Sequence, residues 1–341
     1  MSSANFVEMT TSAVKVLTDG SLSSDQIWIS PISPCQDPTD HQFTAFLKPE
    51  ATAISAGVKF TPLFEALLEI FSTHKVEVGA IRVVSGSFFE RTGIMARHYG
   101  VINAISRLGE AALSENALSM LHERFGEELS SGYELMGGQQ FLQEYQKFSP
   151  FALSILFDNL GSIRLAPGTY ACLVTVEGRR LILLNGFHPY QLERFTRPTA
   201  VTVLLECRTT TPWKSLRKKV AGATNPAKAL PGSFRQVLLE RADEFGLVEV
   251  GQNANGIHLS AGPLEGMVEV QRFFGTDDNS DLSVETTCFG KLLNTADLPE
   301  NLIEQLSDNA SFEVDGQMIS AFDLTEELDV TDAILALRKL S

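Results

Sequence analysis

Strand-like and helical runs of apolar residues alternate along this chain of 341 residues, and that alternation limits the folds it can adopt. Residues 43–48 form an apolar, strand-like run that stops at Pro49, because proline cannot donate to a strand ladder. Residues 60–72 carry aromatic and leucine side chains at helical spacing. Residues 76–85 predict the next strand. The apolar core therefore begins as strand, helix, strand.

The same kind of pattern returns further along the chain. Residues 199–206 are β-branched and predict a third strand, and residues 246–251 predict a last core strand. Residues 263–274 predict a helix with apolar side chains on one face. An α+β sandwich of the ferredoxin-like type, with the order βαββαβ, accommodates these elements.

We divide the chain into four parts on this basis. Residues 1–41 are rich in Ser, Thr, Asp and Pro and predict a lead-in with at most one short helix. The core covers residues 42–99 and 199–275, and residues 100–198 form a large α/β insertion. Residues 276–341 form a small, acidic C-terminal extension.

Turn signals predict two hairpins outside the core. One lies in the insertion and turns at Glu177-Gly178, and the other lies in the extension and turns at Asp315-Gly316. Between about residue 90 and residue 146 the apolar spacing is helical.

Composition limits the class of protein. Apolar residues make up 44% and charged residues 20% of the chain, which is enough apolar material for a sizeable core. The formal net charge of −15 disfavours general binding to nucleic acid or to anionic membrane surfaces. No apolar run is long enough for a membrane span, and we expect no signal peptide.

The four cysteines are scattered along the sequence and show no CxxC spacing. We therefore expect neither a zinc site nor a disulfide framework. Reduced thiols and a cytoplasmic protein fit this pattern best.

His258 follows a loop and directly precedes a helix start marked by Pro263. A histidine that accepts a phosphoryl group needs one accessible ring nitrogen and a hydrogen-bond acceptor on the other. Glu269, inside the helix, and the hydroxyl of Ser260 are candidate partners. Most loop histidines are only solvated or hydrogen-bonded, so this segment alone does not establish a function.

Residues 222–235 form a loop rich in Gly, Pro and Asn that contains Thr224 and ends at Arg235. Hydroxyl, amide and guanidinium donors are what a polyphosphate requires. A basic cluster precedes the loop: Lys214, Arg217, Lys218 and Lys219. Taken alone, such a cluster is more commonly a solvated helix face. Lys48 lies at a strand end, where most lysines are likewise only solvated.

Four separated motifs together resemble the nucleoside diphosphate kinase family. They are LKPEA at 47–51, HY at 98–99, GATNPAKALPGSFR at 222–235 and NGIHLSAGPLEG at 255–266. The stretch with Thr-Asn-Pro and Pro-Gly-Ser-x-Arg is the most specific of these motifs.

The resemblance implies a role for each matching residue. His258 would be phosphorylated, with Glu269 and Ser260 orienting it. The other implied residues contact the phosphohistidine, the ribose or the phosphates: Tyr99 beside the phosphohistidine, Lys48 and Asn255 at the ribose hydroxyls, and Thr224, Arg235, Arg217 and Lys218 at the phosphates.

The resemblance also implies an activity. A nucleoside triphosphate would phosphorylate the enzyme, which would pass the group to a nucleoside diphosphate in a ping-pong reaction. Mg²⁺ would bind through the nucleotide phosphates, with no metal site made by the protein alone. The resemblance further implies a homo-oligomer, although the insertion and the extension add bulk that could block the usual contacts.

Two other functions remain open. The protein could be a divergent phosphotransferase with a different acceptor. The sequence feature that favours this alternative is the insertion at 100–198. It could also be a non-catalytic nucleotide-binding or scaffold protein. Two departures from the family pattern favour this non-catalytic alternative: Lys218 replaces the arginine of the family, and Leu259 replaces the glycine after the histidine. A leucine beside the nucleophile would narrow access to it or reshape the pocket.

Residues of the insertion could also reach the nucleotide. Phe141, Tyr145 and Phe148 are candidates to stack on the base, although a buried core role is the stronger expectation. His188 suggests a second site, but a capped strand end is the simpler interpretation.

Overall fold

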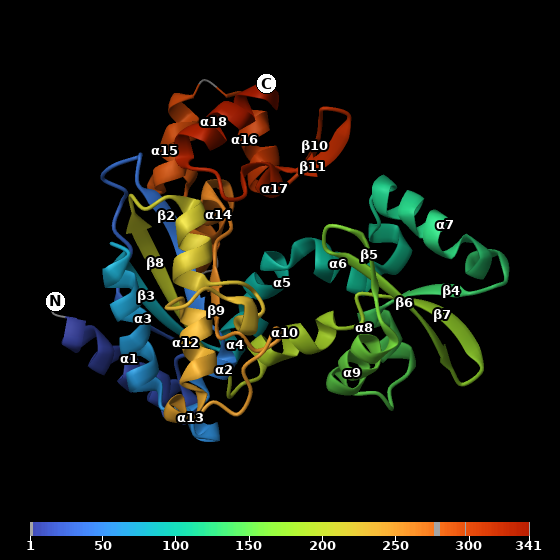
Figure 1. Ribbon diagram of the computed structural model, residues 1–341, viewed down its shortest axis with the longest axis horizontal. Coiled ribbons are helices and arrows are strands. Elements are labelled where there is room, and N and C mark those ends of the chain that lie inside the picture. The colour runs from blue at the N-terminus through green and yellow to red at the C-terminus, as the bar shows by residue number, and fades with distance from the viewer. Residues whose placement is uncertain (1–2, 276–279, 297, 341) are drawn as a thin grey trace. The chain divides into compact units, whose positions relative to one another are not determined.

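Five strands pair into an antiparallel sheet in the order β1-β3-β8-β2-β9 (Figure 1). The computed structural model describes residues 3–275, 280–296 and 298–340. The five strands are β1 (Gln26–Ser30), β2 (His41–Leu47), β3 (Glu77–Ser85), β8 (Val201–Thr209) and β9 (Ile257–Leu259). A mixed helix-and-sheet architecture is confirmed.

Helices follow the strands in a regular order. Helix α3 (Phe60–Thr73) connects β2 to β3, and α12 (Phe234–Glu240) with α13 (Ala242–Phe245) lies between β8 and β9. Helix α14 (Pro263–Phe273) follows β9. The predicted helices at 60–72 and 263–274 are confirmed as α3 and α14.

Strand β2 separates the two faces of the sheet. Phe43, Ala45 and Leu47 belong to the main apolar core, together with side chains of α3 and α12. Phe46 points to the opposite face, because successive strand residues alternate. There it stacks on His258 and meets Phe273 of α14 edge-on. The face toward the main core is therefore apolar. The other face, which α14 covers and which carries His258, combines Phe46 with buried polar side chains such as Thr44, Arg82 and Glu206.

The predicted strand at 246–251 is wrong. Gly246 ends α13 in a left-handed conformation, and the side chain of Val248 is 89% exposed. The alternation of apolar residues there does not correspond to burial. The last core strand is β9, whose three residues pair with β2 so that His258 lies opposite Phe46.

The lead-in is more ordered than predicted. Helix α1 (Ser3–Thr18) has 16 residues, and it buries Val7, Val14 and Leu17 in the main core. These residues are spaced seven and three apart along the helix, which places them on one face. Strand β1 then joins the edge of the sheet beside β3. The abundance of Ser and Thr in this segment concealed both elements.

The chain forms two compact units, Met1–Thr92 with Pro198–Ser341, and Gly93–Arg197. The second unit has a four-stranded sheet in the order β4-β7-β6-β5. Its elements are α5 (Ile94–His98), α6 (Gly100–Leu108), α7 (Glu115–Ser130), β4 (Glu134–Gly137), α8 (Gly138–Glu144), α9 (Pro150–Leu160), β5 (Ile163–Ala166), β6 (Thr169–Val176), β7 (Arg179–Leu184) and α10 (His188–Thr196).

The hairpin predicted at Glu177-Gly178 is confirmed, since β6 and β7 pair antiparallel and both turn residues have positive φ. Strand β4 lies inside the stretch expected to be helical. Phe141 and Tyr145 are buried in the core of this unit, and Phe148 packs against it. His188 is buried at the start of α10, where its ring nitrogens lie 3.2 Å from Gln191 Oε1 and 3.3 Å from Asn103 Oδ1.

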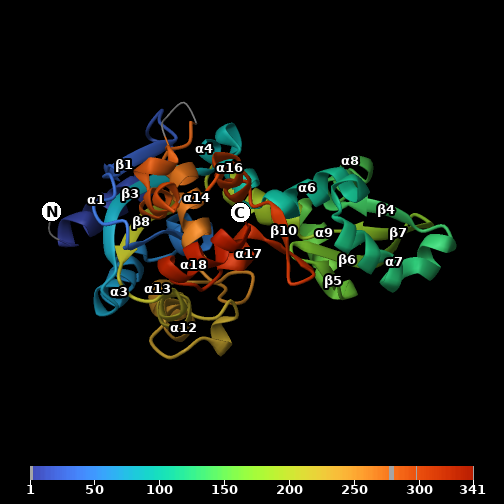
Figure 2. The same cartoon turned by 90° about the horizontal axis from the view of Figure 1, so that it is seen from above.

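The C-terminal residues form a helical layer on α14 (Figure 2). The layer contains α15 (Cys288–Thr295), α16 (Glu300–Ser307), the hairpin β10 (Ser311–Val314) and β11 (Gln317–Ser320), α17 (Ala321–Thr325) and α18 (Val330–Leu337). The hairpin predicted at Asp315-Gly316 is confirmed. Leu264, Met267 and Val268 of α14 share one apolar cluster with this layer. Helix α14 is therefore covered by the sheet on one side and by the C-terminal helices on another. Among the described residues, no helix combines the length and the apolar character needed to cross a membrane.

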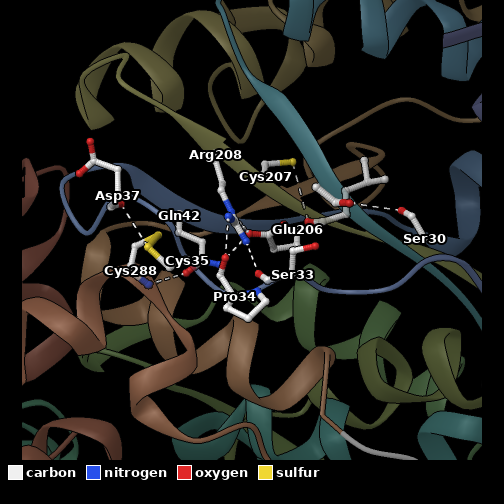
Figure 3. Close-up of polar contacts among 12 residues, drawn as sticks. Ser30, Ser33, Pro34, Cys35, Asp37, Gln42, Glu206, Cys207, Arg208 and Cys288 are labelled. Atoms are coloured by element: carbon white, nitrogen blue, oxygen red, sulfur yellow. Dashed lines mark hydrogen bonds and ion pairs between the residues drawn. A yellow bond between two sulfur atoms is a disulfide. The ribbon is translucent and has the colours of Figure 1, made fainter. Parts of the chain in front are cut away.

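The expectation of four reduced thiols is wrong, because Cys35 and Cys288 form a disulfide (Figure 3). Their Cα atoms are 5.2 Å apart although 253 positions separate them in sequence. Spacing along the chain therefore gave no sign of the pair. The amide N–H of Cys288 donates to Gln42 of β2, and Gln42 donates to the buried Glu206 of β8. The disulfide thus joins the segment before β2 to the C-terminal layer.

Breaking this disulfide should destabilise the first unit. A cross-link that closes so long a loop restricts the unfolded chain, and removing a native disulfide typically costs about 2–5 kcal/mol. Thermal unfolding of the double variant Cys35→Ser, Cys288→Ser should show a lower Tm than the oxidised protein. A thiol reductant should lower the Tm of the wild type toward that of the variant and leave the variant unchanged. Equal Tm values for wild type and variant would contradict the expectation.

Candidate active site

His258 and Glu269 form the central contact of the candidate site. His258 Nε2 lies 2.7 Å from Glu269 Oε1. The imidazole ring also stacks on Phe46, with ring centroids 4.5 Å apart. The Glu269 side chain is 2% exposed and that of His258 is 19% exposed. The ring is therefore held by a carboxylate and by an aromatic face, and part of it still reaches the surface.

Ser260 completes the support of Glu269. Its buried hydroxyl makes a short hydrogen bond to Glu269 Oε2, and it accepts the amide N–H of Thr44 at 3.0 Å. Both oxygens of Glu269 are thus engaged, one by His258 and one by Ser260. The structure brings together the three residues proposed from sequence, and their roles in a reaction stay predictions.

The protonation state of His258 follows from its surroundings. Burial, and then the positive charges of Lys48, Arg217 and Arg235, lower the pKa of His258 well below its usual value of 6.5. The ring is therefore neutral at pH 7. An ionised carboxylate only accepts hydrogen bonds, so the proton of the neutral ring lies on Nε2 and the lone pair on Nδ1.

Arg235 connects the loop at 222–235 to β9. Arg235 is 7% exposed, and its guanidinium donates to the carbonyls of Gly222 at 2.7 Å and Ile257 at 2.9 Å. Burial, and then the charge of Arg217, lower the pKa of Arg235 to about 10, so it remains charged at pH 7. The side chain holds the residue before His258, and its predicted contact with a diphosphate stays a prediction.

Lys48, Asn255 and Thr224 form one chain of contacts. Lys48 Nζ donates to Asn255 Oδ1 at 2.8 Å, and Asn255 Nδ2 donates to the carbonyl of Thr224 at 3.2 Å. The backbone N–H of Lys48 also donates to Gly256 at 2.9 Å. Three segments far apart in sequence therefore meet beside β9, and the predicted contacts of Lys48, Asn255 and Thr224 with a nucleotide stay predictions.

Arg217 and Lys218 lie in a six-residue π-helical segment, Leu216–Ala221. Arg217 donates to the carbonyl of Leu259 at 2.8 Å, and its other nitrogen lies 3.7 Å from a carboxylate oxygen of Glu326 in the C-terminal layer. Lys218 is exposed. Arg217 therefore braces the strand that carries His258.

Leu259 does not narrow the site. Its side chain is fully buried in the main core, on the opposite face of β9 from His258. The expectation that it would reshape the pocket is wrong, because neighbouring strand residues point to opposite faces.

Tyr99 belongs to the second unit. Its ring lies edge-on to His188 at 6.0 Å and tilted to Phe195 at 6.3 Å. Its predicted place beside the phosphohistidine stays a prediction.

Two residues of the first unit were missed by the sequence analysis. Phe46 stacks on His258, and its position two residues before Lys48 on a strand could have suggested that both lie on one face. Glu265 lies one helical turn before Glu269 and accepts the amide N–H of Ala261. The helical spacing of the two glutamates was the signal for it.

No protein-family model matches this sequence. No curated protein matches it either. Among solved structures, a transition-state mimic of nucleoside-diphosphate kinase from Borrelia burgdorferi with bound vanadate and ADP is 13% identical, covers 72% of this chain and 92% of that chain, and gives a TM-score of 0.33. An NDP kinase from Pyrobaculum aerophilum is 17% identical, with coverage of 71% and 100% and a TM-score of 0.32. Similarity at this level does not establish a shared function, so the functional case rests on the residues of the site.

Replacing Arg235 by methionine should destabilise the first unit. The carbonyls of Gly222 and Ile257 would lose a charged donor, and such hydrogen bonds contribute about 1.5–3 kcal/mol each. Chemical denaturation should therefore give a loss of about 3–6 kcal/mol in the free energy of unfolding. Arg241→Met is the control, because the Arg241–Glu244 pair is at the surface and should matter by less than about 1 kcal/mol. Equal losses in the two variants would contradict the structural role of Arg235.

Proposed function

We propose that this protein is a phosphotransferase that moves the terminal phosphate of a nucleoside triphosphate to a nucleoside diphosphate through a phosphohistidine at His258. The observation that carries the proposal is the neutral, partly exposed imidazole whose Nε2 is bonded to a buried carboxylate. With the proton on Nε2, the lone pair of Nδ1 would be the one that attacks the phosphorus.

The first half-reaction would begin with attack of His258 Nδ1 on the terminal phosphorus. The bond from that phosphorus to the bridging oxygen breaks, and the nucleoside diphosphate leaves. The phosphorylated ring gains a positive charge, and the Glu269 carboxylate at Nε2 stabilises it. Ser260 keeps Glu269 in place through its second oxygen.

The second half-reaction reverses these bonds. A terminal oxygen of a nucleoside diphosphate attacks the phosphorus, the phosphorus–nitrogen bond breaks, and the neutral ring of His258 returns. Because the ring, the carboxylate and the hydroxyl are already positioned, the protein contributes orientation and charge in both directions.

Charge supports the proposed substrate. The protein has a net charge of −15, yet Lys48, Arg217 and Arg235 are close enough to His258 to depress its pKa. This cationic surrounding favours an anionic ligand such as a polyphosphate. Both oxygens of Glu269 are already engaged. Mg²⁺ would therefore enter with the nucleotide, where it bridges phosphate oxygens and neutralises charge.

The order of elements supports a ferredoxin-like core. β2, α3, β3, β8, α12 and β9 follow one another as βαββαβ, with the four strands in the spatial order β3-β8-β2-β9. We propose that this core carries the nucleotide and that the second unit is an insertion between β3 and β8.

A phosphotransferase with a different acceptor is the second candidate. The observation that favours it is the separate unit Gly93–Arg197, which has its own sheet and core. A non-catalytic nucleotide-binding or scaffold role is less well supported, because Leu259 lies in the core and leaves the support of His258 intact.

Location and assembly stay predictions. A cytoplasmic location was expected from the cysteines, but the Cys35–Cys288 disulfide is more typical of an oxidising compartment. A homo-oligomer is implied only by the family resemblance.

Incubation with radiolabelled ATP and Mg²⁺ should label the protein in an acid-labile, base-stable form, as expected of a phosphohistidine. His258→Ala should remove the label, while His122→Ala, which changes an exposed histidine of α7, should retain it. Discharge by nucleoside diphosphates would separate the two transferase candidates. Label that persists in His258→Ala would contradict the assignment of the nucleophile, and nucleotide binding without label would favour the non-catalytic role.

His258 should stay neutral well below pH 6.5, because protonation of a largely buried ring beside three cations is unfavourable. An NMR titration of its ring protons, assigned with His258→Ala, should show a midpoint well below 6.5. Lys48→Met should move the midpoint upward, since it removes one of those positive charges. A midpoint at or above the ordinary histidine value in the wild type would contradict the account.

A further inference from the structure

Glu265 lies in the first turn of α14, four residues before Glu269 and five after Ser260. Its carboxyl accepts the amide N–H of Ala261, the residue that follows Ser260. Glu265 and Glu269 are four residues apart, so their side chains project from the same face of the helix. Glu265 therefore closes the turn that leads from β9 into α14, while Glu269 holds the histidine on β9.

The C-terminal layer supports the same turn from outside. The backbone N–H of Glu327 donates to the carbonyl of Ala261 at 2.9 Å. The carbonyl oxygen of Thr325 lies so near Gly262 that a β-carbon there would be 2.4 Å from it. The turn is therefore fixed on both sides, by Glu265 from within α14 and by the segment after α17.

Several charged groups surround the Glu265 carboxyl. Glu269 comes from its own helix, Arg217 from the π-helical segment and Glu326 from the end of α17. His258 of β9 contacts Glu269 rather than Glu265. Burial, and then the negative charge of Glu269, raise the pKa of Glu265 to about 8. The carboxyl is therefore mainly protonated at pH 7, and its unprotonated oxygen can still accept from Ala261.

We propose that Glu265 is a positioning residue, whose neutral carboxyl fixes the Ala261 turn so that Ser260 and Glu269 hold His258 without placing a second negative charge near the phosphate. This inference rests on the proposed phosphoryl transfer. Ionisation of Glu265 would repel both the phosphate and Glu269. The transfer rate should then fall as the pH rises through about 8.

The test compares Glu265→Gln with Glu265→Ala in the full-length protein. Glutamine keeps a neutral acceptor for Ala261, so labelling of His258 by ATP at pH 7 should stay within about threefold of wild type, and the alkaline loss should disappear. Alanine removes the acceptor, so labelling at pH 7 should fall about tenfold. Glu300→Gln is the control, because it changes an exposed glutamate in the first turn of α16 and should retain the wild-type profile.

A second readout works without nucleotide. The ring resonances of His258 should shift with a midpoint near pH 8 in the wild type, as Glu265 ionises nearby, and this step should be absent in Glu265→Gln. Absence of label in the wild type would reject the proposed function. The ring titration would still show whether Glu265 ionises close enough to His258 to affect its ring. The inference is overturned if Glu265→Gln keeps the alkaline step in either readout, if the wild-type ring shows no such step, or if Glu265→Ala labels like the wild type.

Discussion

The buried carboxylate of Glu269 is the contact on which the rest of the site depends. One oxygen accepts a hydrogen bond from the imidazole of His258, and the other accepts one from the hydroxyl of Ser260. A carboxylate is costly to bury unless both oxygens are engaged, so the position of α14 and the position of β9 are fixed together. Phe46 of β2 stacks on one face of the ring. The outcome is a histidine with a defined tautomer and partial access to solvent.

Charge is distributed unevenly around this contact. Lys48, Arg217 and Arg235 lie around one histidine of an acidic protein. Burial, and then their positive charges, lower the pKa of His258 and keep the ring neutral. Under the proposed function, the same cations would favour a phosphate in front of Nδ1, so one arrangement would serve both the nucleophile and its substrate. Arg217 also reaches Glu326 and the strand at Leu259, which makes the C-terminal layer part of the electrostatic environment of the site.

The sequence allowed the main elements of the core and most residues around His258 to be predicted, because strand and helix periods and short motifs are local properties. The spacing of Glu269 and Ser260 relative to His258 matched their contacts. The Cys35–Cys288 pair could not be predicted, since closeness across 253 positions depends on the whole fold. The strand expected at 246–251 failed because an alternating pattern does not reveal whether Val248 is buried. Leu259 was misjudged for a similar reason, as its direction depends on the register of β9.

The most direct test of this account is to identify which ring nitrogen of His258 carries the phosphoryl group. The two phosphohistidine isomers can be distinguished by phosphorus NMR of the denatured phosphoprotein or by comparison with synthetic standards. Because Nε2 is hydrogen-bonded to Glu269, the account predicts attachment of the phosphoryl group at Nδ1. Attachment at Nε2, or at a residue other than His258, would contradict it.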